Sequence, residues 1–81
     1  MTPLYSPRFI RQFDNLPLEI QQKTRKQVEF LLRDIRHPSL RAKKYDEADD
    51  IWQARVDDHY RFYFRIDGDM YTLTSVRKHR D

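Results

Sequence analysis

The chain of 81 residues contains no cysteine and only one glycine. Without cysteine it can form no disulfide, no thiolate nucleophile and no cysteine metal site, and a reducing compartment suits it best. A single glycine is too few for a glycine-rich loop that cradles phosphates. The three histidines show no paired metal-ligand spacing, and no Ser/His/Asp arrangement can be argued from their order. We therefore expect no metal and no small-molecule cofactor.

Long apolar runs are also missing. The N-terminal segment Met-Thr-Pro-Leu-Tyr-Ser-Pro has no apolar stretch of the kind found in signal peptides, and no later run approaches the length of a membrane span. These features predict a cytoplasmic protein without membrane contact. At this length the chain can bury one core at most, so residues 1–81 are expected to form a single domain, with the five Phe, five Tyr and one Trp supplying much of the buried area.

Charge of one sign is only slightly in excess. Sixteen Lys and Arg residues against thirteen Asp and Glu residues give a net charge of +3, which by itself is a weak argument for a polyanionic partner. A binding surface for an anion therefore requires the basic residues to be sorted onto one face of the fold.

The first half of the chain has the spacing of a helical hairpin. Ser6 followed by Pro7 predicts the start of a short helix, with Phe9, Ile10 and Phe13 facing inward. A second helix is predicted over residues 17–36, because apolar residues recur at helical spacing from Ile20 to Ile35. Asn15 is expected to cap this helix, and His37-Pro38 to end it. Leu4 and Tyr5 suggest a brief first strand.

The second half changes to a period of two. Residues 51–56, 60–66 and 70–76 are rich in β-branched and aromatic side chains, and the connections between them are too short for a crossover. They therefore predict an antiparallel meander. The Asp67-Gly68 pair fits a two-residue type I′ turn. Residues 37–50 are expected to form a loop, with a possible short strand near residues 40–45.

Alternation along these strands sorts their side chains onto two faces. Phe62, Phe64 and Ile66 share one face with Trp52, Ala54 and Val56, and this apolar face is predicted to pack on the helices. The opposite face carries Gln53, Arg55, Arg61, Tyr63 and Arg65. Three arginines and a tyrosine there could bind successive phosphates and stack on a base. A solvated face whose arginines pair with aspartates fits the spacing equally well.

The C-terminal run Val76-Arg77-Lys78-His79-Arg80-Asp81 extends the last strand with basic and titratable groups. A histidine has an ordinary pKa near 6.5, so His79 could exchange a proton near neutral pH, whereas arginine serves as a fixed cation. Taken alone, however, this run is more typical of a basic tail without chemistry.

Two stretches together resemble the RelE/ParE superfamily of toxins: SPRFIRQFDNLPLEIQQKTRKQVEFLL and IWQARVDDHYRFYFRIDGDMYTLTSVRKHRD. The similarity is most specific from Trp52 to Asp69, where Tyr60-Arg61 follows a polar turn and Asp67-Gly68-Asp69 forms an acidic hairpin. It implies an α+β fold in which a short N-terminal strand and a helical hairpin pack on a small antiparallel sheet. It also implies a toxin of a type II toxin-antitoxin system with a cognate antitoxin as partner.

RelE-like members of the superfamily cut mRNA on the ribosome and use the 2′-hydroxyl of the substrate as the nucleophile. By resemblance, Arg61 contacts the scissile phosphate, Arg55 is the basic residue of the preceding strand, and Arg77 and His79 match an Arg-x-His-Tyr segment. The chain departs from that segment at Arg80, which replaces the tyrosine, and Glu47 is only a candidate for the carboxylate of YoeB-like enzymes. Further RNA contacts are expected from Gln53, Tyr63, Arg65, Lys78, Arg80, Lys43 and Lys44.

Three functions remain open at this point. The leading hypothesis is a ribosome-dependent mRNA endoribonuclease, with Arg55, Arg61 and Arg77 on the phosphate and His79 as proton carrier. The second is a ParE-like inhibitor of DNA gyrase, since ParE proteins share the fold without the catalytic set. The third is an inactive module that binds an antitoxin.

Overall fold

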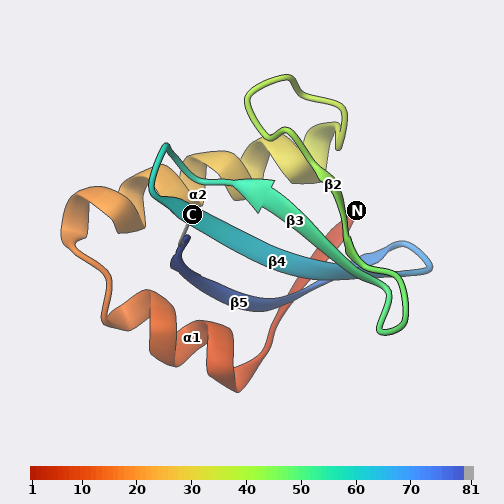
Figure 1. Cartoon of the computed structure of the whole chain (residues 1–81), viewed down its shortest axis with the longest axis horizontal. Helices are drawn as coiled ribbons and strands as arrows, with labels where there is room; N and C mark the ends of the chain where they lie inside the picture. The colour runs from red at the N-terminus through yellow and green to blue at the C-terminus, as the bar shows by residue number, and fades with distance from the viewer. Residues whose placement is uncertain (80–81) are drawn as a thin grey trace.

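The computed structural model describes residues 1–79, and its fold is an α+β arrangement of one sheet and two helices (Figure 1). The elements follow one another along the chain as β1 (Thr2–Tyr5), α1 (Pro7–Asp14), α2 (Leu18–Arg33), β2 (Lys43–Asp46), β3 (Ile51–Arg55), β4 (Tyr60–Asp67) and β5 (Met70–Lys78). The expected strand, helical hairpin and meander therefore occur in the predicted order. A short strand is also present in the region that the sequence left open.

The sheet is mixed, not purely antiparallel. Its strand order is β1-β5-β4-β3-β2, and β1 pairs parallel to β5 while all other neighbours are antiparallel. The expectation of an antiparallel sheet holds for the meander but is wrong for β1. Both helices and strands β2 to β4 separate β1 from β5 in the chain, and parallel neighbours need a long connection of this kind.

The first helix begins as its sequence indicates. The Ser6 side chain accepts a hydrogen bond from the amide of Phe9 at 3.1 Å, and Pro7 occupies the first turn, where no amide hydrogen is required. Phe9 is buried as expected, whereas Ile10 is 48% exposed. Ile10 follows Phe9 by about 100° around the helix, so an eight-residue helix that buries Phe9 turns Ile10 toward solvent.

The second helix is shorter than residues 17–36. Asn15 does not cap it, because Asn15 is the C-terminal cap of α1, where its side-chain amide donates to the carbonyl of Arg11 at 3.0 Å. The helix stops at Arg33 because Asp34 is extended and its carboxylate accepts a hydrogen bond from the amide of Arg36 at 2.9 Å. A side chain that binds its own backbone in this way competes with helix continuation, and it acts before His37-Pro38 is reached.

The core lies between the helices and one face of the sheet, and α2 crosses behind β3 and β4 in Figure 1. Ala54, Phe62 and Phe64 are fully buried, so the predicted parity of β3 and β4 is confirmed. They share the core with Ile20, Val28 and Leu31, which are buried apolar residues of α2. Within residues 1–79, no helix is long and apolar enough to cross a membrane.

The hairpin between β4 and β5 turns on Gly68 and Asp69, since Asp67 pairs with Met70. Gly68 has φ of +62°, but Asp69 does not have positive φ. A type I′ turn needs positive φ at both central residues, whereas a type II′ turn needs it only at the first. The predicted type I′ turn is therefore wrong, and the glycine is used one position earlier than expected.

Candidate nucleic-acid interface

Three arginines lie side by side on three neighbouring strands. Arg55 of β3 is paired with Arg61 of β4, and Arg61 is paired with Arg77 of β5. Directly opposite residues in antiparallel strands are about 5 Å apart, and like charges in such positions destabilise a sheet. We call these three residues the arginine row. The repulsion within the arginine row lowers the stability of the folded protein. Its charge is therefore better suited to binding an external anion than to stabilising the fold.

A β-bulge brings Arg77 into this row. The register between β4 and β5 shifts, so that Tyr63 is paired with Ser75 but Phe64 is paired with Leu73, and Thr74 is the extra residue. Strict alternation from the buried Leu73 would place Ser75 and Arg77 toward the helices. The bulge reverses that parity, puts Val76 into the core and turns Arg77 to the outer face beside Arg61.

Two hydrogen bonds hold the bulge. The Thr74 hydroxyl donates to the carbonyl of Tyr63 at 3.2 Å, and the Ser6 hydroxyl donates to the carbonyl of Thr74 at 3.0 Å. Next to it, the amide of Val76 donates to the side-chain oxygen of Gln12 at 2.9 Å. Ser6 both caps α1 and binds Thr74, so the start of α1 covers the edge of β5 where the pairing with β1 has ended. This cover supports the strand segment that carries Arg77.

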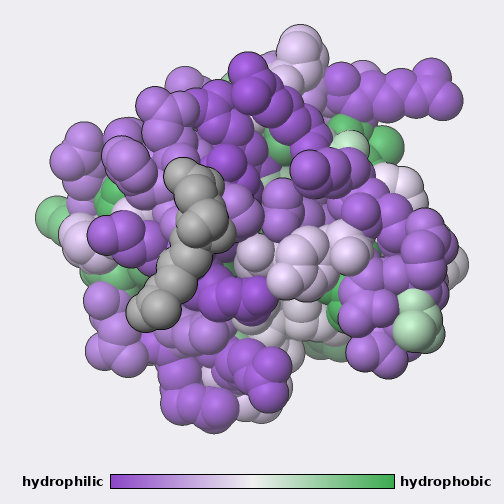
Figure 2. Space-filling view, viewed as in Figure 1, coloured by the Kyte–Doolittle hydropathy of each residue, from purple (hydrophilic) through white to green (hydrophobic). Residues whose placement is uncertain are grey.

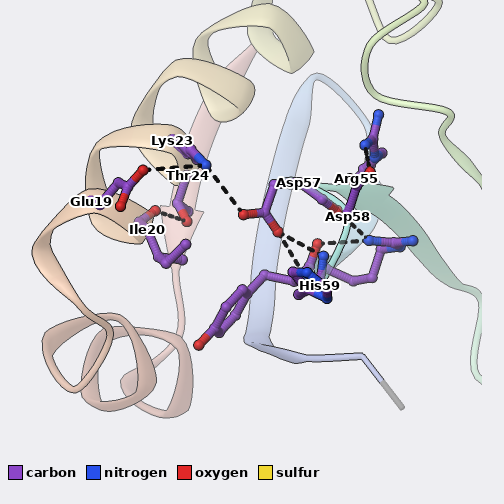
Figure 3. A network of polar contacts seen from close by, with 10 residues as sticks. Glu19, Ile20, Lys23, Thr24, Arg55, Asp57, Asp58 and His59 are labelled. Atoms are coloured by element: carbon purple, nitrogen blue, oxygen red, sulfur yellow. Dashed lines mark hydrogen bonds and ion pairs between the residues drawn. The ribbon is translucent and has the colours of Figure 1, made fainter. Parts of the chain in front are cut away.

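The members of the row are held in different ways. Arg55 forms an ion pair with Asp58 (Figure 3). Arg61 donates to the backbone carbonyls of Asp57 at 2.5 Å and Tyr60 at 3.0 Å. The solvated-face hypothesis, in which each arginine has an aspartate partner, therefore fits Arg55 but not Arg61, which has no ion pair within residues 1–79.

Arg77 is held by uncharged neighbours. Its Nη1 donates to the Ser75 hydroxyl at 3.1 Å, and its guanidinium carbon lies 4.2 Å from the ring centroid of Tyr63. No carboxylate within the described part of the chain forms an ion pair with it. Burial raises the pKa of the Tyr63 phenol, so this ring is a neutral support for the cation at physiological pH. Arg77 is exposed and keeps its charge available to a ligand.

Asp57 organises the turn that follows β3. Its Oδ1 accepts hydrogen bonds from the amides of His59 at 2.8 Å and Tyr60 at 2.9 Å, and its Oδ2 lies 3.4 Å from the ammonium of Lys23 on α2 (Figure 3). Partial burial opposes ionisation, but the two amides and Lys23 outweigh it and lower the pKa of Asp57. The turn that supplies the carbonyl of Asp57 to Arg61 is thereby tied to the second helix.

His79 follows β5 at the same end of the sheet. Its amide donates to the carbonyl of His59 at 2.7 Å, which brings the segment after β5 against the turn between β3 and β4. Lys78, just before it, is exposed and paired with Tyr60, and alternation puts it on the face opposite to Arg77. The backbone of His79 therefore lies near the end of the arginine row. Arg80 lies outside the described residues.

A second row runs beside the arginine row. Lys43, Gln53, Tyr63 and Ser75 are paired in turn across β2, β3, β4 and β5. Gln53 is 7% exposed and Tyr63 is 3% exposed. Their burial leaves little surface for the RNA contacts expected of them. Tyr63 in particular is covered by Arg77 and has no open ring face for a base.

The exposed aromatic residue of this face is Tyr45, which the sequence analysis did not single out. Tyr45 is 55% exposed, and its ring meets that of Tyr63 edge-on, with centroids 5.0 Å apart and an interplanar angle of 66°. Its sequence signal was an aromatic residue directly after Lys43-Lys44 in a predicted strand. The signal was weak because a register irregularity at Tyr45 breaks simple alternation in β2.

The neighbouring lysine is turned the other way. Lys44 is paired with Trp52 of the apolar face, its ammonium lies 5.2 Å from the Trp52 ring centroid, and it forms an ion pair with Asp50. The hydrogen bond that the Lys44 ammonium donates to the Asp50 carboxylate is the main cause that raises the pKa of Lys44. The structure therefore does not bring Lys44 to the arginine face. Glu47 lies in the turn after β2 and acts electrostatically on Lys44.

A hollow of about 360 Å³ opens on the arginine face between β2 and β5. Tyr45, Tyr63, Arg65, Ser75 and Arg77 line it, together with Arg8, Asp46, Asp49, Ile51 and Thr74. The side of the sheet turned away from α2 is seen in Figure 2, where hydrophilic residues dominate and paler ones gather near the centre. Within residues 1–79, no group of three or more His, Asp or Glu side chains is placed to hold a metal ion.

Comparison with solved structures shows the fold. A YoeB/ParE toxin from Agrobacterium tumefaciens superposes with a TM-score of 0.83 at 13% identity, covering 99% of this chain and 100% of that chain. The YoeB-YefM complex from Staphylococcus aureus gives 0.78 at 12% identity over 99% and 98% of the two chains. The RelB-RelE antitoxin-toxin complex from Methanococcus jannaschii gives 0.75 at 17% identity over 93% and 88%. No protein-family model and no curated protein matches the sequence. The chain has the fold of the RelE/YoeB/ParE toxins.

Proposed function

We propose that this protein is the toxin of a type II toxin-antitoxin system and that it cleaves mRNA on the ribosome. The observation that carries the proposal is the arginine row, in which Arg55, Arg61 and Arg77 are paired across three strands of a fold shared with RelE and YoeB toxins. Adjacent guanidinium groups cost the folded protein stability, but they match the charge that develops on a phosphate during cleavage.

The chemistry follows from what these groups can and cannot do. The 2′-hydroxyl of the RNA attacks the adjacent phosphorus and gives its proton to a water molecule, the bond to the 5′-oxygen of the next nucleotide breaks, and this oxygen takes up a proton. The products are a 2′,3′-cyclic phosphate and a 5′-hydroxyl. Arginine stays protonated, so the row neutralises the extra negative charge of the transition state. His79 exchanges the proton, because imidazole titrates near neutral pH, and donation to the leaving 5′-oxygen is the step we assign to it.

A cognate antitoxin is the second proposed partner. Several solved structures with this fold are antitoxin-toxin complexes. Two surfaces of the chain suit such a protein. One is the basic arginine face, and the other is an apolar groove of about 410 Å³ between α1 and α2, lined by Phe9, Phe13, Val28 and the exposed Ile10. An acidic segment fits the first surface and an amphipathic segment fits the second.

Inhibition of DNA gyrase without cleavage is the alternative function. It is favoured by the name of the A. tumefaciens neighbour, which joins YoeB with ParE, and by the ion pair that partly neutralises Arg55. The two functions differ in the damage they cause. A nuclease leaves mRNA cut at defined codon positions, whereas a gyrase inhibitor leaves mRNA intact and damages DNA.

The test is induced expression in a bacterium with primer-extension mapping of a reporter mRNA, comparing the wild type with Arg61→Ala and His79→Ala. Loss of one preorganised charge contact typically slows catalysis about 100- to 1000-fold, so we expect codon-positioned cuts that vanish in both variants. Arg33→Ala, in the last turn of α2, is the matched control and should cut like the wild type. Intact transcripts with gyrase-linked DNA breaks would transfer the assignment to the alternative function.

A further inference from the structure

The hollow on the arginine face combines three kinds of group: an aromatic ring, cations and carboxylates. It has an exposed aromatic ring in Tyr45, cations in Arg65 and Arg77, and carboxylates in Asp46 and Asp49. Its volume of about 360 Å³ is at the small end of ligand sites. These groups suit a ligand with a planar part for the aromatic ring, an anionic part for the arginines, and hydrogen-bond donors for the carboxylates.

Tyr45 is held as a flat platform. Its edge contact with Tyr63, with ring centroids 5.0 Å apart, sets the orientation of its ring, and the guanidinium of Arg77 packs on Tyr63 at 4.2 Å from the ring centroid. With Tyr63 only 3% exposed and Tyr45 55% exposed, the outer ring of the pair is the one that a ligand meets. An aromatic ring supported in this way is suited to stacking on a planar group.

The charges of the hollow distinguish between two anionic ligands. Arg65 and Arg77 attract either a nucleic acid or an acidic peptide. Asp46 and Asp49 repel any anion placed beside them, but their oxygens accept hydrogen bonds from the exocyclic amino groups of adenine, cytosine and guanine, and an ionised acidic side chain has no such donor. The amide of Asp49 donates to the carboxylate of Asp46 at 3.2 Å, which keeps the two residues together at the rim. The combination favours a nucleotide over an acidic peptide.

We propose that this hollow is the subsite for a single unpaired nucleotide of the RNA, with its base stacked on Tyr45, its amino group on Asp46 or Asp49, and its phosphate on Arg65 and Arg77. The inference rests on the proposed function of the arginine face and deepens it. Arg77 belongs both to the row and to the hollow, so the nucleotide in the hollow is adjacent to the phosphate that the row binds. A base with an exocyclic amino group, which is adenine, cytosine or guanine, is preferred there over uracil.

Equilibrium binding of short RNAs tests the subsite without requiring cleavage. The full chain is titrated with fluorescent oligonucleotides that carry 2′-deoxy substitutions and cannot be cut, and 2-aminopurine at successive positions reports stacking by loss of its fluorescence. Tyr45→Leu should weaken binding roughly 5- to 100-fold and restore the fluorescence, since stacking on one aromatic residue contributes on this scale. Tyr45→Phe, which keeps the ring, should bind like the wild type.

Two matched variants sharpen the test. Tyr5→Leu removes another exposed tyrosine, 42% exposed and lining the groove between α1 and α2, and should leave RNA binding unchanged. Asp49→Ala should reduce the preference for adenine or cytosine over uracil while binding to uracil stays the same or improves. Both results together support a subsite for a base instead of general attraction of a polyanion.

Two outcomes would overturn the subsite. One is Tyr45→Leu binding RNA as tightly as the wild type while Arg77→Gln loses binding. The other is an acidic peptide that displaces the RNA and whose affinity falls in Tyr45→Leu, which would assign the hollow to a protein partner. Failure of the proposed function has a different signature, because transcripts would then be uncut by the wild type whether or not Tyr45 stacks on a base.

Discussion

Neighbouring residues of β4 lie in opposite environments on the two faces of the sheet. Phe62 and Phe64 are fully buried against the helices, while Arg61 and Arg65 project from the other side, where Arg61 is half-buried and Arg65 is exposed. The helix face gains stability from each residue it buries, whereas the arginine face sets like charges side by side. Adjacent residues of the same strand therefore have different roles: one stabilises the fold, and the next belongs to the proposed functional face.

Phe62→Ala should break the helix face and have the largest effect on stability. Truncation of a fully buried phenylalanine leaves a cavity and typically costs about 3–5 kcal/mol, which is a large part of the stability of so small a protein. Chemical denaturation followed by circular dichroism measures the loss. Arg61→Ala, one residue away, should change the free energy of unfolding by less than about 1 kcal/mol. Equal losses in the two variants would contradict the separation of the faces.

Ser6→Ala should affect both faces at once. It removes the cap of α1 and the hydrogen bond to the carbonyl of Thr74, so we expect a loss of about 1–2 kcal/mol in the free energy of unfolding. Because the bulge sets the position of Arg77, RNA binding should also weaken. Ser6→Thr, which retains a hydroxyl, is the control. Unchanged RNA binding in stably folded Ser6→Ala would show that the bulge holds without this contact.

The Asp57 carboxylate should make stability depend on pH in the acid range. Its pKa is lowered in the folded protein, so its stabilising contribution is present above the unfolded-state pKa and is lost as the pH falls through the folded-state pKa. In Asp57→Asn this part of the pH dependence should be missing, as measured by denaturation at a series of pH values. Asp69→Asn, in the exposed hairpin, is the comparison variant. Parallel curves for wild type and Asp57→Asn would contradict the assignment.

Asp58→Asn should have the smallest effect on stability and sharpen the role of the arginine face. The Asp58 side chain is 80% exposed, and an ion pair at such a site contributes about 0–1 kcal/mol. Removing its charge leaves Arg55 available to phosphate, so RNA should bind more tightly and with a steeper dependence on salt. Titrations at several salt concentrations test this. Weaker binding in Asp58→Asn would mean that Asp58 holds Arg55 in its working position.

Local patterns were sufficient for much of the fold and for part of the site. Apolar spacing located both helices and the three strands of the meander, and alternation sorted Arg55, Arg61 and Phe62 onto the correct faces. The two errors at the helix ends arose where a side chain binds the backbone. Asp34 ended α2 early, and Asn15 closed α1 instead of opening α2. Such hydrogen bonds compete with the backbone hydrogen bonds of the helix over only a few residues, so the spacing of apolar residues does not reveal them.

The amino-acid sequence by itself determined which residues could be buried and which charges could share a face, because side-chain direction repeats regularly along helices and strands. Only the tertiary structure decided that Arg77 joins Arg61 and that Tyr45, not Tyr63, is the exposed ring. The first outcome depends on a bulge supported by Ser6, 68 residues away from Thr74 in the chain, and the second on the ring contact that Tyr45 of β2 makes with Tyr63 of β4 across the intervening β3. Contacts between distant segments set both, and no local pattern contains them.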